Sequence, residues 1–345
     1  MDYIEFTNYW IYNNDTIIIK PSFNNNIDLI DFNDNIKSLV FSNYEDFNNA
    51  IKNINDNNSD VYNISEFNQP VYNFPEFLLN LTFGYHFNRP VNNLPQNLQN
   101  LTFGNYFNQS VDNLPPNLKN LTFGHCFNQS VDNLPINLQN LTFSYYFNQS
   151  IDNLPINLQN LTFSWRFNQL VDNLPIQIQN LTFRYEFNQN VDNLPSLLNL
   201  TFGHKFNQSV NNLPQSLLNL TFGNYFNQSV DNLPLSLQNL TFNDCFNCTV
   251  DNLPSNLLNL TFGINFNQSL DNLPNSIISL IFNRKTCNFN RELNCLPNSI
   301  CEIKLSLNYI KKIEQIPTSL NKIICSSSYK YIDELKLKNI KIKKY

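Results

Sequence analysis

The stretch Leu98–Pro115, which runs LQNLTFGNYFNQSVDNLP, recurs with little change from about residue 60 to Pro274. Its Leu-Thr-Phe triplet begins at residues 81, 101, 121, 141, 161, 181, 200, 220, 240 and 260. The step is 20 residues, except that one residue is missing between 181 and 200. A fixed period of this length indicates a solenoid, in which each coil buries its apolar side chains against its neighbours and the whole usually serves as a binding surface.

One repeat predicts the structure of one coil. If Leu98 is repeat position 1, apolar residues occupy positions 1, 4, 6, 10, 14 and 17. Positions 4–6 alternate inward, outward and inward, as a short strand does. Leu114-Pro115 should end that pattern and begin an extended, polyproline-like return. No helical period of 3.6 residues appears, so we expect an all-β solenoid of short parallel strands with non-helical returns and no long helices.

The same positions can be followed beyond the regular copies. Position 4 falls at residues 17, 39, 61, 81, 101, 121, 141, 161, 181, 200, 220, 240, 260, 280, 303 and 323, which predicts about 16 coils. We therefore expect an N-terminal cap (1–16), degenerate coils (17–60), regular repeats (61–282), degenerate coils (283–326) and a C-terminal cap (327–345). The lysine-rich residues 335–345 would form a final edge strand that discourages end-to-end stacking. A nucleic-acid or nuclear-localisation signal is the alternative there.

Composition limits the cellular setting. The 345 residues carry a net charge of −6, which predicts no general attraction to nucleic acid or to anionic membranes. The first 20 residues lack the basic start and apolar stretch of a signal peptide, and no run of about 18 apolar residues could span a membrane. Seven cysteines, an odd number with no relation to the repeat, suit a reducing compartment. We therefore expect a cytoplasmic protein.

The repeat resembles known families. The L-x-x-L-x-F pattern of residues 98–103 resembles a short leucine-rich repeat. The more specific match is the Phe-Asn pair at 107–108 followed by Val111 and Pro115, which resembles the FNIP repeat of social amoebae and giant DNA viruses. The resemblance implies a leucine-rich-repeat-like stack and, for a viral chain, the host cytoplasm. Some viral relatives begin with an F-box that recruits a ubiquitin ligase, but residues 1–60 show neither its Leu-Pro opening nor its helical period.

Positions 7–9 vary most from coil to coil, and we expect them to follow the strand on its outward, concave side. Because adjacent strands lie about 4.8 Å apart, side chains at the same position should form a continuous stripe. Tyr, Trp and Arg are enriched at protein-binding hot spots. The middle of the stripe supplies the predicted partner-binding residues, which are Tyr145, Tyr146, Trp165, Arg166, Arg184, Tyr185 and Glu186. Drift at unconstrained positions is the alternative.

Two polar positions have structural interpretations. Position 11 is Asn in every regular coil, and a column of amides can satisfy backbone groups at the corner between coils. Position 15 is Asp in eight coils. Those carboxylates are expected to be turn residues that bond nearby backbone N–H groups. A calcium column is the alternative, although the glycine-rich ligand loop of calcium-binding repeats is absent and Asn211 interrupts the column.

Nothing in the sequence supports catalysis or a cofactor. The three histidines fall in separate coils without triad-like partners, and no phosphate-binding loop occurs. Cys245 and Cys248 have the spacing of a zinc half-site, but no second half stands nearby, so structural thiols are expected. We predict a non-enzymatic protein-binding solenoid, without metal or small-molecule ligand. The alternatives are a structural or particle-associated protein, glycosylated at sequons such as those at Asn100 and Asn108, or the substrate-recognition part of a ubiquitin-ligase assembly.

Overall fold

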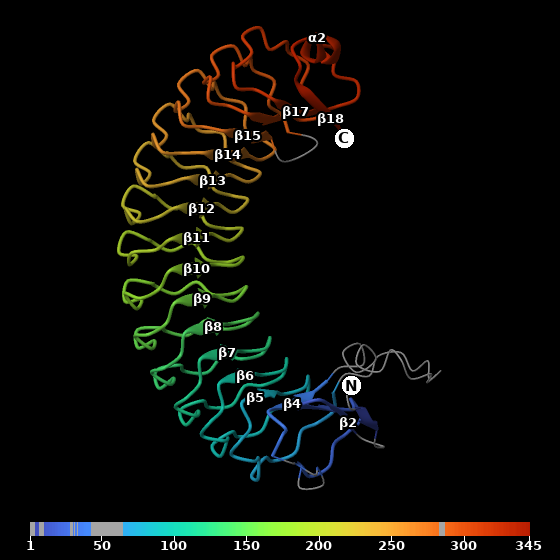
Figure 1. The fold of residues 1–345 in the computed structure, drawn as a ribbon. Coiled ribbons are helices and arrows are strands. Elements are labelled where there is room, and N and C mark those ends of the chain that lie inside the picture. The colour runs from blue at the N-terminus through green and yellow to red at the C-terminus, as the bar shows by residue number, and fades with distance from the viewer. Residues whose placement is uncertain are drawn as a thin grey trace. The chain divides into compact units, whose positions relative to one another are not determined.

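The computed structural model describes residues 4–6, 10–27, 30, 32, 34–42, 65–282 and 287–345. These residues form two compact units (Figure 1). The first unit comprises residues 1–169 and 173–178, and the second comprises residues 170–172 and 179–345. Each unit is a ladder of short strands, with one strand from each coil.

The first unit begins with an antiparallel pair. Strand β1 (Ile4–Phe6) pairs with β2 (Trp10–Asn13), and β2 pairs antiparallel with β3. From β3 onward each strand pairs in parallel with the next. These parallel strands are β3 (Thr16–Ile19), β4 (Ser38–Phe41), β5 (Asn80–Thr82), β6 (Asn100–Thr102), β7 (Asn120–Thr122), β8 (Asn140–Thr142) and β9 (Asn160–Thr162).

The second unit continues the pattern with parallel pairs from β10 to β18. Its one described helix, α2 (Ile332–Leu337), precedes β18, so the lysine-rich end is a short helix followed by a strand rather than a strand throughout. The strands are β10 (Asn180–Thr182), β11 (Asn199–Thr201), β12 (Asn219–Thr221), β13 (Asn239–Thr241), β14 (Asn259–Phe262), β15 (Ser279–Phe282), β16 (Glu302–Lys304), β17 (Lys322–Cys325) and β18 (Lys341–Lys344).

The repeat sets the strand register. Position 4 always faces position 4, as in Leu81 opposite Leu101 and Leu200 opposite Leu220. The leucine is buried, and the Asn and Thr on either side of it lie on the outer face. A one-residue slip would turn every leucine outward, so the apolar pattern holds the register. The predicted all-β solenoid with a leucine-rich-repeat-like coil is confirmed.

Phenylalanine rings form the core of each coil. All six predicted apolar positions are buried, from Leu98 to Leu114 in the reference coil. Phe103 stacks on Phe107 within the coil, with ring centroids 3.7 Å apart. Phe107 also stacks on Phe127 of the next coil at 6.1 Å. Two columns of stacked rings therefore run through each unit and tie every coil to its neighbours.

One expected coil falls largely outside the described residues. Its predicted position 4, Val61, lies outside the described residues, and β4 pairs directly with β5. The ring of Phe41 stacks on that of Phe67 at 4.0 Å. Regular coils keep these two ring positions 3.6–3.8 Å apart. Phe41 and Phe67 thus occupy the two ring positions of one coil, and the described residues contain about 15 coils.

The return path differs from the extended path that its proline suggested. The carbonyl of Pro115 accepts a hydrogen bond from the N–H of Leu118 at 3.3 Å, which closes a tight turn. A second turn lies at residues 112–113. The return is therefore non-helical, as expected, but it is built from turns. A sequence of turns keeps the coil short enough for its apolar positions to meet inside.

The asparagine column at position 11 is confirmed as structural. Asn108 Oδ1 accepts a hydrogen bond from the backbone N–H of Asn128 at 2.9 Å, and the same contact recurs one coil later from Asn148 to Asn128. The side-chain Nε2 of Gln129 also donates a hydrogen bond to Asn108 Oδ1 at 3.1 Å. The amides are half-buried rather than buried. Each one satisfies a backbone donor that the corner would otherwise leave without a partner.

Candidate functional site

The varied positions 7–9 lie in the bend that follows each strand. In the coil of β8 the strand ends at Thr142, and the bend is centred on residues 145–146. Positions 7–9 follow the strand, as expected, but they lie in a bend rather than on the strand face. Positions 3 and 5, which are Asn and Thr, occupy the face itself. Side chains at the same position of neighbouring bends do meet, as expected.

Four of the predicted residues form one cluster in the first unit. Tyr145 packs edge-on against Tyr146 at 4.7 Å and stacks on Trp165 of the next coil at 5.8 Å. The guanidinium of Arg166 lies 4.9 Å from the ring centroid of Tyr146 and 5.7 Å from that of Tyr145. Tyr146 is 44% exposed and Trp165 is 40% exposed. We call Tyr145, Tyr146, Trp165 and Arg166 the bend cluster.

Two other predicted residues belong to a charged group in the second unit. Glu186 forms an ion pair with Lys205 at 2.7 Å, and this contact raises the pKa of Lys205. The Lys205 ammonium lies 5.6 Å from the ring centroid of Tyr185, which stacks on His204 at 4.8 Å. Arg184 is exposed beside them.

The sequence analysis did not predict Lys205 and His204 as site residues, although the charge pattern of the repeat indicates the ion pair of Lys205 with Glu186. Lys205 follows Glu186 at the same repeat position of the next coil, where opposite charges meet.

The backbone of the bend depends on position 7. The N–H of Phe107 donates to the carbonyl of Gly104 at 3.4 Å, so this bend closes on itself. A Cβ atom at Gly104 would lie 1.9 Å from the carbonyl oxygen of Gly84, which excludes a side chain in this conformation. The carbonyl of Ser144 instead accepts from the N–H of Trp165 in the next coil at 2.9 Å. Where position 7 is serine instead of glycine, as at Ser144, its carbonyl thus bonds the next coil and holds the backbone of Trp165 in the bend cluster.

The aspartate column is held by side chains rather than by backbone N–H groups. Asp112 accepts hydrogen bonds from the amide of Asn133 at 3.0 Å and from the hydroxyl of Ser110 at 2.7 Å. These bonds hold the pKa of Asp112 below its ordinary value. Hydrogen bonds from Ser150 and Asn173 likewise lower the pKa of Asp152. Asparagine amides donate in the same way to Asp112, Asp132, Asp152, Asp172, Asp231 and Asp251, so hydrogen bonds within the protein hold these carboxylates in place.

Acid should therefore destabilise the fold through this column. A carboxyl group whose folded pKa lies below its unfolded value near 3.8 contributes stability above that value and loses it as the pH falls through the folded pKa. We expect the thermal midpoint of the wild type to fall more steeply below about pH 4 than that of a triple variant with Asp112→Asn, Asp152→Asn and Asp231→Asn. Asn211 already occupies this position in one coil. Identical pH profiles would contradict the expectation.

The remaining sequence motifs are the cysteines, the possible metal ligands and the glycosylation sequons. Within the described residues, no three His, Cys, Asp or Glu side chains are placed to hold a metal ion, and all seven cysteines are free thiols. Burial raises the pKa of Cys248, whose thiol donates to Asn227. The Nδ2 atom of Asn100, the atom that a glycan would occupy, donates to Asn80 in a ladder along the strand face. No helix of the described chain is long and apolar enough to cross a membrane.

The fold defines the class of protein as a leucine-rich-repeat-like solenoid. The profile of the FNIP Repeat matches residues 67–106, 90–126, 107–146, 127–164, 147–183, 206–245 and 247–285. These matches cover more than half of the chain, and the protein belongs to the FNIP repeat family.

Two solved structures are similar to this chain. The first is CroV588 of a giant virus, described as a novel circular leucine-rich-repeat structure, with a TM-score of 0.61 and 29% identity. The match covers 94% of this chain and 65% of CroV588, so the chain spans just under two thirds of that protein. The second is YopM from Yersinia enterocolitica WA-314, with a TM-score of 0.45, 19% identity, and coverage of 74% of this chain and 65% of YopM. No curated protein matches the chain.

Proposed function

We propose that this protein is a non-enzymatic interaction solenoid that binds a partner protein through the bend cluster and the strand face beside it. One observation carries the proposal, namely that Tyr145, Trp165 and Arg166 come together on exposed bends. Aromatic and arginine side chains that are preassembled in this way lose little conformational freedom when a partner covers them. Repeat proteins of the leucine-rich type typically mediate protein interactions, which supports the same function.

The likeness to CroV588 supports a giant-virus setting. We extend the proposal to a host protein as the partner and to the host cytoplasm as the place of action. The glycosylated structural protein is less favoured, because a glycan on Asn100 would break the asparagine ladder. A recognition role in a ubiquitin-ligase assembly is compatible with the same surface and would appear as a ligase component among the recovered partners.

Removing the bend cluster should abolish partner binding. Trp165→Ala removes the central ring, and Arg166→Glu reverses its only cation. Each change should weaken binding by about 2 kcal/mol, roughly 30-fold, as is typical of hot-spot residues. Affinity purification from native or infected cells identifies the partner, and titration of the purified partner measures the loss.

Tyr72→Ala is the matched control, because Tyr72 is an exposed aromatic residue of the same unit outside the bends. It should bind like the wild type. Equal thermal midpoints for all variants would show that folding is unaffected. Undiminished partner binding by the Trp165→Ala, Arg166→Glu double variant would reject the bend cluster as the binding site.

A further inference from the structure

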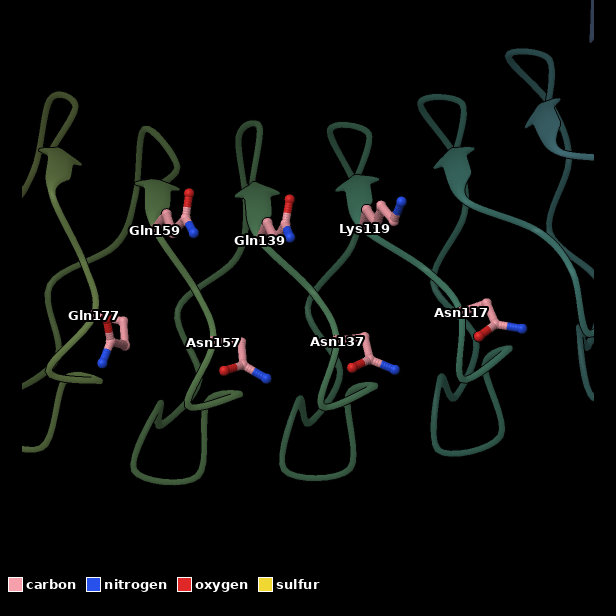
Figure 2. A pocket seen from close by; sticks show the side chains of 7 residues that line it. All are labelled: Asn117, Lys119, Asn137, Gln139, Asn157, Gln159 and Gln177. Carbon is pink, nitrogen blue, oxygen red and sulfur yellow. The ribbon is translucent and has the colours of Figure 1, made fainter.

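An open groove of about 250 Å³ crosses four consecutive coils of the first unit, at the start of strands β7–β9 (Figure 2). Figure 2 shows its lining side chains in two rows. Position 20 supplies the lower row, which consists of Asn117, Asn137, Asn157 and Gln177. Position 2 supplies the upper row, which consists of Lys119, Gln139 and Gln159. Six of these seven side chains are carboxamides, so the groove offers paired donors and acceptors with almost no charge.

The three asparagines of the lower row are fixed in orientation. Asn137 Nδ2 donates to the carbonyl of Pro116 at 3.0 Å, and Asn157 Nδ2 donates to the carbonyl of Ile136 at 3.0 Å. Asn117 is held in the same way by Gln96 at 2.9 Å. Because the amide nitrogen of each is bound to the preceding coil, its position in the row is set before any ligand arrives.

The upper row supplies uncommitted donors. Within the described part of the chain, the side chains of Lys119, Gln139 and Gln159 make no hydrogen bond or ion pair. All three are exposed. In Figure 2 the amide nitrogens of Gln139 and Gln159 lie on the side of the lower row. These two donors suit a ligand that is rich in carbonyl acceptors.

An apolar ridge borders the lower row. Position 19 precedes it in the chain and carries Ile136, Ile156 and Ile176, which are 62%, 56% and 71% exposed. The exposed ring of Pro116 begins the same ridge. Four apolar side chains in line on consecutive coils form a patch of the kind that marks an interaction surface. The complete surface thus combines a ridge for apolar side chains with a row of donors for carbonyl groups.

The spacing of the coils selects the form of the ligand. Two coils advance by about 9.6 Å, since parallel strands lie about 4.8 Å apart. One turn of a polyproline II helix, three residues long, advances by about 9.3 Å. Equivalent residues of such a helix would therefore meet every second coil. A β-strand repeats every two residues, about 6.6 Å, and matches neither one coil nor two.

We propose that this groove binds a proline-rich segment of a partner protein in the polyproline II conformation. The backbone carbonyls of that helix are free of internal hydrogen bonds and accept from Gln139 and Gln159. Its pyrrolidine rings pack on the isoleucine ridge. The four coils span about 14 Å, the length of about five residues of such a helix. Lys119 at one end favours a segment with a carboxylate there.

Fluorescein-labelled hexaproline tests this proposal by fluorescence anisotropy with the intact protein. We expect saturable binding to the wild type and none by a labelled Gly-Ser hexapeptide. Ile156→Asp, and separately the double variant Gln139→Ala, Gln159→Ala, should each weaken binding at least about tenfold, or 1.4 kcal/mol. Leu235→Asp is the matched control, because Leu235 holds the same repeat position in the second unit and is 64% exposed. It should bind hexaproline like the wild type.

Three outcomes would overturn the proposal. The first is the absence of saturable hexaproline binding up to about 1 mM, the weak end of measurable affinity. The second is an equal loss of binding in Leu235→Asp. The third is binding of cellohexaose in place of hexaproline, which would assign the carboxamide rows to a sugar. The bend-cluster variant Trp165→Ala should bind hexaproline normally, so failure here leaves the function proposed for the bends untouched.

Discussion

Replacing Phe107 with alanine should lower the free energy of unfolding by about 3–5 kcal/mol, the usual cost of emptying a buried phenylalanine site. The ring is fully buried and stacks on Phe103 within its coil and on Phe87 and Phe127 in the two adjacent coils. The cavity cannot close by local collapse, because the flanking rings are held in column by the strand register. Urea unfolding followed by circular dichroism measures the change.

Tyr106→Ala is the control for this experiment, since Tyr106 is the exposed neighbour of Phe107 in the same coil. It should change stability by no more than about 0.5 kcal/mol. A loss below about 1 kcal/mol for Phe107→Ala would mean that the coils rearrange around the missing ring, and that the ring columns do not dominate the stability of the first unit.

Replacing Asn128 with alanine should cost about 1–3 kcal/mol, because its Oδ1 is the acceptor for the backbone N–H of Asn148 and alanine leaves that donor without a partner. The Asn128→Asp variant keeps an acceptor oxygen at the same place and should lose less. Unfolding midpoints of the two variants in urea provide the comparison.

Asn113→Ala is the matched control for the asparagine column, because Asn113 is an exposed asparagine at position 16 of a regular coil. It should unfold like the wild type. If Asn128→Asp lost as much stability as Asn128→Ala, the importance of Asn128 would lie in its Nδ2 group rather than in its acceptor.

The regular coils could be predicted because a single pattern sets strand, corner and core together. Each apolar position of Leu98–Leu114 is buried as the alternation required, and the asparagine of each corner bonds the next coil. The irregular region before residue 67 is harder to assign from spacing, for a physical reason. The Phe67-Asn68 pair has the chemistry of a corner, but only the contact between Phe67 and Phe41 shows which strand it completes. Sequence spacing alone does not show which strand a corner completes where the repeat is irregular.

The candidate site was only partly predictable. Variation marked positions 7–9, and four of the residues there do cluster in the first unit. Their location in a bend depends on where hydrogen bonding ends the strand, at Thr142, one residue earlier than the apolar alternation suggests. The carboxamide groove could not be predicted from the sequence, because Gln139 and Asn137 look like ordinary surface residues there. Only the stacking of adjacent coils places them in rows.

The parallel register has a consequence for the length of the chain. Leu81 faces Leu101 and Leu101 faces Leu121 in the same alignment, so one regular coil can take the place of another in the stack. Removing residues 101–120 would place Leu121 against Leu81 with the same partners that Leu101 has now. Folding therefore constrains the make-up of a coil but not the number of coils. Gain or loss of whole copies can change how far the molecule reaches without disturbing the coils that remain.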